Sequence, residues 1–139
     1  MKPFYRIIEH TADIGIEVDA PDREGIFTRA ARAMFELMCG LQPVGRTEKR
    51  RLSVQGETVE ELLIAWLNEV LYVYSVEMFV FSEFSEVMLD DTSFSACGWG
   101  ERSDMERIKG GLEIKAATYH DTFIKQVGDR WRARVIFDV

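Results

Sequence analysis

His10-Thr11-Ala12-Asp13-Ile14-Gly15 is a short polar interruption between two segments that have strand-like patterns. Before it, residues 4–8 are rich in aromatic and β-branched residues, which favour strands. After it, apolar residues at positions 14, 16 and 18 alternate with small or acidic residues at 15, 17 and 19. This period of two indicates a strand with one solvated face, so Asp13 is expected where two strands meet.

Two helices are predicted next. Asp22 is a natural N-cap, because its carboxylate can accept the unpaired amides of a first turn. Apolar residues then recur at helical spacing from Ile26 to Met38, and Gly40 is a plausible left-handed stop. The second helix is predicted from a capping box at 58–61. Its apolar stripe from Leu62 to Tyr74 is interpreted as core that packs on a sheet.

The remaining segments have mostly strand patterns. The connector 41–50 holds much of a basic cluster (Arg46, Lys49, Arg50 and Arg51), interpreted as solvated surface, and a short strand follows at 52–54. Further strands are predicted at 79–84, 86–89, 93–98, 112–118, 122–127 and 131–137, with a helical turn at 104–109. The pattern predicts an α+β fold in which two helices pack on a largely antiparallel sheet.

Composition and charge narrow the class of protein. With 139 residues, of which 47% are hydrophobic, the chain is predicted to form one globular domain over residues 1–139. The net charge of −7 argues against direct binding of nucleic acid and favours a metal cation or a basic protein partner. The chain has no apolar run long enough to span a membrane and no signal-peptide pattern, so we expect a cytoplasmic protein.

Motifs for catalysis are absent from the sequence. There is no Gly-x-Ser-x-Gly and no phosphate-binding Gly-rich loop, so we expect no enzyme. A metal-dependent hydrolase or nuclease that uses His10 or His120 as a base stays an alternative, as does a chaperone-like interaction module. Cys39 and Cys97 lack the spacing of zinc ligands and are interpreted as reduced, small apolar residues.

Three acidic groups could meet at the two ends of the chain. If the terminal strand lies beside the strand that starts at Ile14, then Asp13, Asp138 and the terminal carboxylate of Val139 converge. Three carboxylates repel one another, and a hard cation such as Ca²⁺ or Mg²⁺ would relieve that repulsion. Alternatively, Asp13 caps a turn through backbone amides, which is the usual role of an aspartate in such a place.

Three segments together resemble the archease family. They are Glu9–Gly15, the stretch Glu113–His120, and the ending Phe137-Asp138-Val139. The second segment has Ala117 where the family usually has valine, which affects packing rather than chemistry. The resemblance implies a strand-helix-strand-strand module duplicated by nesting one copy inside the other.

The same resemblance implies a function. Members of the family are cofactor proteins of the RtcB-type RNA-splicing ligase in tRNA splicing and RNA repair, where they promote guanylylation and repeated turnover of the ligase. The family's calcium ligands fall on Asp13, Asp138 and Val139, the last through a backbone or terminal oxygen.

Apart from the resemblance, Lys115, Tyr119, His120 and Asp121 form a second polar cluster in the sequence. Two interpretations of this cluster stay open: a solvated sheet face followed by a turn, or a contact surface.

Overall fold

The computed structural model describes residues 4–10, 13–40, 44–103 and 111–139, without the side chains of residues 9 and 10. These residues form two helices and two antiparallel sheets. The strands are β1 (Tyr5–His10), β2 (Asp13–Ala20), β3 (Glu48–Gln55), β4 (Phe79–Leu89), β5 (Ser93–Arg102), β6 (Ala116–Val127) and β7 (Arg130–Asp138), and the helices are α1 (Arg23–Cys39) and α2 (Val59–Glu77). The predicted α+β class is confirmed.

Both helices begin at the predicted caps. The Asp22 carboxylate accepts the Gly25 amide at 2.7 Å, and the Thr58 hydroxyl accepts the Glu61 amide at 3.1 Å. The return bond of the second cap differs from the expectation, because the Glu61 carboxylate accepts the Glu57 amide at 2.7 Å. Each cap satisfies amides that a first helical turn leaves unpaired.

The two sheets have related topologies. One has the strand order β1-β2-β7-β6 and the other β3-β5-β4, and every pairing is antiparallel. β2 precedes α1 and pairs with β7, the second strand of the pair β6 and β7. β3 precedes α2 and pairs with β5, the second strand of the pair β4 and β5. The orders β2-β7-β6 and β3-β5-β4 therefore correspond. The unit from β3 to β5 is inserted between α1 and β6, which agrees with the expected nested duplication.

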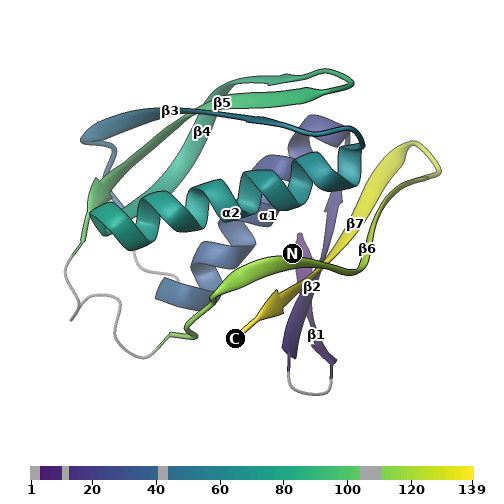
Figure 1. Cartoon of the computed structure of the whole chain (residues 1–139), viewed down its shortest axis with the longest axis horizontal. Helices are drawn as coiled ribbons and strands as arrows, with labels where there is room; N and C mark the ends of the chain where they lie inside the picture. The colour runs from purple at the N-terminus through teal and green to yellow at the C-terminus, as the bar shows by residue number, and fades with distance from the viewer. Residues whose placement is uncertain (1–3, 11–12, 41–43, 104–110) are drawn as a thin grey trace.

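The helices lie between the two sheets, and each helix contacts strands of both (Figure 1). Both helices are therefore buried on more than one side. Trp66 of α2 is fully buried, and its ring meets the rings of Phe84 and Phe94 edge to face, with centroids 5.2 and 4.8 Å away. Its indole nitrogen donates to the carbonyl of Phe27 in α1 at 3.0 Å, which joins the two helices at the centre of the core.

Several predicted boundaries were wrong. β3 starts at residue 48 instead of 52, and residues 112–115 precede β6 instead of forming its start. The predicted breaks at residues 85 and 119–121 are irregularities within the continuous strands β4 and β6. Glu86 and Asp121 have positive φ values of 50° and 52°. Each lies where its strand has more residues than its partner, so the strand bends there without ending the pairing. The predicted turn at 104–109 lies outside the described residues.

Neither helix in the described part of the chain combines the length and the apolar character that crossing a membrane requires.

Candidate functional site

The two ends of the chain meet at one end of the four-stranded sheet. Ile14 of β2 pairs with Phe137 of β7, so the next pair in this antiparallel register is Asp13 and Asp138. On either side, β1 continues the row through the pairing of His10 with Asp13, and β6 through the pairing of Ala116 with Asp138. The predicted placement of the terminal strand beside the strand that starts at Ile14 is therefore confirmed.

Alternation along the strands directs both aspartates away from the helices. Phe137 is fully buried and Ile14 packs against the core, so their neighbours Asp138 and Asp13 lie on the opposite, outer face. Asp138 is exposed and Asp13 is partly exposed. The backbone carbonyl of Asp138 accepts the Lys115 amide at 2.8 Å, which holds the end of β7 against the segment before β6.

Gly15 brings the two central strands together next to this row. A Cβ atom at position 15 would lie 2.6 Å from Cδ1 of Ile136 and 3.1 Å from the carbonyl oxygen of Val135. A larger residue would therefore have to displace a buried side chain of β7 directly beside Asp138. The glycine of the opening motif thus serves the close approach of β2 and β7.

The candidate metal ligands at this end of the sheet are all carboxylate oxygens. Two aspartate carboxylates and the terminal carboxylate suit a hard cation such as Ca²⁺ or Mg²⁺, whereas zinc prefers nitrogen and sulfur. Among the residues that the structure describes, no three His, Cys, Asp or Glu side chains gather closely enough to hold a metal ion. Within these residues, the terminal carboxylate of Val139 is a group that could join the two aspartates as a third ligand.

The second predicted polar cluster lies on the irregular part of β6. Tyr119, His120 and Asp121 are exposed, and Lys115 is exposed just before the strand. Nε2 of His120 lies 3.5 Å from Oδ2 of Asp121, and both side chains remain more than half exposed. The Thr118 carbonyl accepts the Thr122 hydroxyl at 2.9 Å, which closes the bulge. The bulge therefore presents these side chains on an open surface rather than in a cleft.

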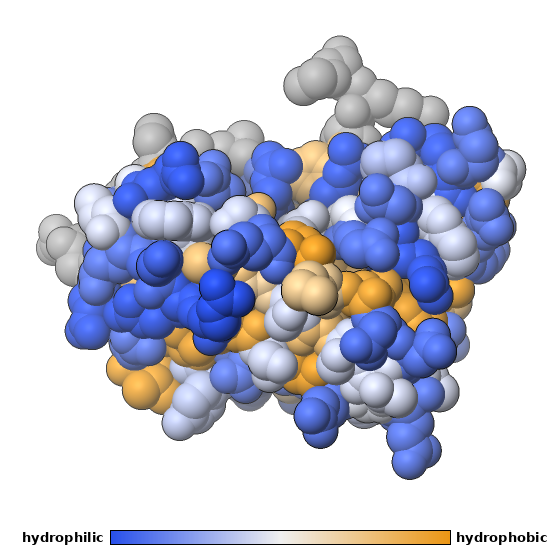
Figure 2. Space-filling model, turned by 90° about the horizontal axis from the view of Figure 1, so that it is seen from above, coloured by the Kyte–Doolittle hydropathy of each residue, from blue (hydrophilic) through white to orange (hydrophobic). Residues whose placement is uncertain are grey.

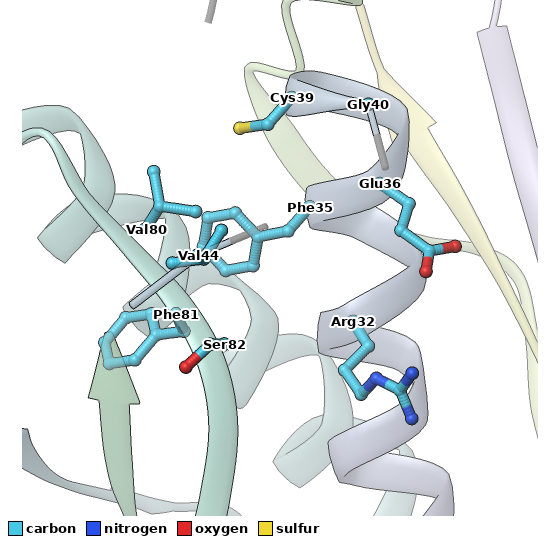
Figure 3. A pocket seen from close by; sticks show the side chains of 9 residues that line it. All are labelled: Arg32, Phe35, Glu36, Cys39, Gly40, Val44, Val80, Phe81 and Ser82. Atoms are coloured by element: carbon cyan, nitrogen blue, oxygen red, sulfur yellow. The ribbon is translucent and has the colours of Figure 1, made fainter. Parts of the chain in front are cut away.

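The two cysteines lie on different elements. Cys39 ends α1 and Cys97 lies on β5 of the other sheet. Cys39 lines a cavity of about 280 Å³ between the end of α1 and the start of β4, together with apolar side chains such as Phe35 and Val80. Figure 3 shows Arg32 and Glu36 on the helix side of this cavity, directed away from the apolar residues. The cavity was not predicted from the sequence, because its walls come from two regions far apart in the chain, residues 32–44 and 80–82.

An ion-pair row crosses the outer face of the four-stranded sheet. The Glu17 carboxylate forms ion pairs with the guanidinium groups of Arg6 on β1, at 2.7 Å, and of Arg134 on β7, at 2.6 Å. The Glu17 side chain is only 10% exposed. Burial alone would raise the pKa of Glu17, but the hydrogen bonds from Arg134 and Arg6 outweigh burial and lower it below the ordinary glutamate value. The carboxylate form of Glu17 therefore stabilises the folded state.

Replacing Glu17 by glutamine is expected to reduce stability at neutral pH by about 1 kcal/mol, because two arginines lose their charged partner. The pKa of Glu17 is lower in the folded than in the unfolded chain, so its contribution is present above the unfolded pKa and disappears as the pH falls through the folded pKa. The difference in unfolding free energy between wild type and variant should thus shrink in acid.

Urea unfolding of both proteins at several pH values from 7 to 3 measures this difference. Glu57→Gln, at an exposed position, is the control, and a difference that grows in acid would contradict the assignment.

The comparisons with known proteins agree with this architecture. The sequence model of the archease protein family (MTH1598/TM1083) matches residues 5–139. The chain belongs to the archease family. An archease of Pyrococcus abyssi is 37% identical over 136 residues, which cover 94% of this chain and 95% of that protein. An archease of Methanosarcina barkeri is 32% identical over 139 residues, covering 97% and 95%.

Two solved structures extend the archease assignment to three dimensions. The solution structure of Methanobacterium thermoautotrophicum protein 1598 is 31% identical, with a TM-score of 0.82, and the match covers 98% of this chain and 99% of that one. The crystal structure of a Thermotoga maritima protein, described as an archease and possible chaperone, is 25% identical, with a TM-score of 0.66 and coverage of 100% and 97%. The archease fold therefore extends over nearly the whole chain.

Proposed function

We propose that this chain is a protein cofactor of an RtcB-type RNA-splicing ligase, which it helps to become guanylylated and to turn over repeatedly in tRNA splicing and RNA repair. The proposal rests on membership of the archease family over residues 5–139. The observation that carries it is the row of Asp13 and Asp138 beside the chain terminus, which places acidic groups together on the outer face of the four-stranded sheet. We propose a role as an activator in the cytoplasm rather than as a catalyst.

The residues of the row would hold a divalent cation, Ca²⁺ or Mg²⁺, through Asp13, Asp138 and Val139. When bound, such a cation would neutralise the carboxylates and offer a positive centre to the phosphate groups of a nucleotide. The fold of the chain would place the oxygen ligands of this cation. Backbone pairing of β2 with β7 positions the aspartates, and the Lys115 amide holds the carbonyl of Asp138.

The proposed function is tested with purified ligase, GTP and divalent metal, with and without this chain. We expect the chain to increase both the guanylylated fraction of the ligase and the number of RNA ends joined per ligase molecule. Unchanged guanylylation and turnover would refute the proposal. Protection of several unrelated proteins from aggregation, with no effect on the ligase, would instead support the chaperone role that the Thermotoga maritima description names as possible.

A further inference from the structure

The outer face of the four-stranded sheet is basic, although the chain as a whole has a net charge of −7. Arg130, Arg132 and Arg134 lie at alternate positions of β7, opposite in direction to the buried or half-buried residues 131, 133 and 135. Arg6 of β1 and Lys125 of β6 lie on the same face, because Arg6 is in register with Arg134 through Glu17, and Lys125 pairs with Arg132. We call these five residues the basic face.

Two acidic residues lie among the five basic ones. Glu17 forms ion pairs with both Arg6 and Arg134, and Asp19 forms one with Arg130 at 2.7 Å. Arg132 lies between Asp19 and Lys125 in register, and in the described part of the chain neither Arg132 nor Lys125 forms an ion pair with a carboxylate. The face therefore has a surplus of positive charge, concentrated on β7 and β6.

The geometry of the face suits a polymer that carries one negative charge per unit. Side chains two residues apart on a strand are separated by about 7 Å, so β7 places three guanidinium groups in a line, of which those of Arg130 and Arg134 also pair with Asp19 and Glu17. Folded protein surfaces mix both signs of charge, whereas a nucleic-acid strand is negative along its whole length. Guanidinium groups also match phosphate oxygens in a bidentate geometry.

An aromatic ring lies within this line of charges. Phe123 of β6 is partly exposed, with Nζ of Lys125 at 4.7 Å and the guanidinium carbon of Arg134 at 5.2 Å from its ring centroid. Basic sheet faces that include aromatic side chains are a common platform for single-stranded nucleic acid, which they bind through the backbone with little dependence on sequence. The acidic row at Asp13 and Asp138 marks the limit of the face at the other end of the sheet.

We propose that the basic face binds the phosphate backbone of single-stranded RNA. This inference deepens the proposed function and rests on it, since the ligase acts on RNA ends that a cofactor could help to retain. Binding is expected to be weak and independent of sequence, with a dissociation constant in the range of about 10⁻⁴ to 10⁻⁵ M at moderate salt. The net charge argues against strong binding, whereas the local distribution of charge permits weak binding.

The test measures the fluorescence anisotropy of a labelled oligouridylate of about 12 nucleotides, titrated with the full chain at several salt concentrations. In the basic-face variant, Lys125→Gln and Arg132→Gln are combined. The matched control combines Lys49→Gln and Arg51→Gln, which remove the same charge from the outer face of the other sheet. On that face, hydrophilic residues surround an apolar area (Figure 2), and Arg51 is already paired with Glu86 at 2.8 Å.

We expect the basic-face variant to lose at least tenfold in affinity at low salt, and the control to stay within about twofold. The slope of log affinity against log salt should become shallower by about 1.4 in the basic-face variant, since each phosphate contact with a single strand contributes about 0.7. If the double variant unfolds, each single substitution should reduce the slope by about half of that amount. Equal losses in both variants, no saturable binding by the wild type, or tighter binding of labelled oligoglutamate than of RNA would overturn the proposal.

Failure of this inference can be distinguished from failure of the proposed function. In a guanylylation assay with GTP and metal but without RNA, the basic-face variant should stimulate guanylylation as the wild type does. Loss of RNA binding with intact guanylylation is the expected result. A wild type that does not stimulate guanylylation would refute the proposed function, while the anisotropy titration would still decide whether the face binds RNA.

Discussion

Replacing Asp138 by asparagine is expected to abolish stimulation of the ligase while the fold persists. Asp138 is exposed and its side chain lies outside the core, so the change in unfolding free energy should stay within about 0.5 kcal/mol. The substitution removes one negative charge from a group of three and one oxygen ligand of the proposed cation. We expect the affinity for Ca²⁺ to fall at least tenfold, which corresponds to about 1.4 kcal/mol or more.

Calorimetric titration with Ca²⁺ and the guanylylation assay measure the two effects separately. Asp129→Asn is the matched control, because Asp129 is also exposed but lies in the turn between β6 and β7. Removal of Val139 should weaken calcium binding in the same direction if the terminal carboxylate is a ligand. An Asp138→Asn variant that stimulates the ligase like the wild type would contradict the proposed site, and stimulation without any calcium binding would remove the metal from it.

Replacing Trp66 by alanine is expected to lower the free energy of unfolding by about 3–5 kcal/mol, as is typical when a large buried aromatic residue is truncated. Trp66 is fully buried and packs against Phe84 and Phe94. The truncation also leaves the carbonyl of Phe27 without its indole donor inside the core. Because a domain of this size has a total stability of about 5–15 kcal/mol, a large part of that stability would be lost.

Urea unfolding followed by circular dichroism measures this loss. Tyr72→Ala is the control, because Tyr72 is an aromatic residue of the same helix that is 63% exposed. We expect the control to change stability by no more than about 0.5 kcal/mol. A similar loss for both variants would contradict this expectation, because alanine favours the helix at both positions and only Trp66 of the two is buried in the core.

Local signals in the sequence predicted the elements whose causes are local. The caps at Asp22 and Thr58 began both helices where expected, because each cap involves residues three positions apart. The arginines at 130, 132 and 134 also carried a readable signal, since they alternate with residues that face the core. They were not predicted as a basic face, because the overall charge of −7 indicates an acidic surface.

Strand boundaries were predicted less well. β4 and β6 each pass through a residue with positive φ, Glu86 and Asp121, and then resume pairing with the same neighbour. Polar residues at such a bulge resemble the polar residues of a turn, so local composition favours ending the strand. Whether the strand ends or bends depends on the partner strand, which no local pattern specifies.

The sequence by itself determined two amphipathic helices, the faces that they bury and the period of the strands that follow, because hydrophobic spacing and capping act over a few residues. It also determined that acidic residues lie near both chain ends. Only the tertiary structure decided that β2 pairs with β7, which brings Asp13 beside Asp138, and that five basic residues from three strands share one face. The pairing of β2 with β7 joins residues more than a hundred positions apart, and no local pattern in the sequence specifies such a pairing.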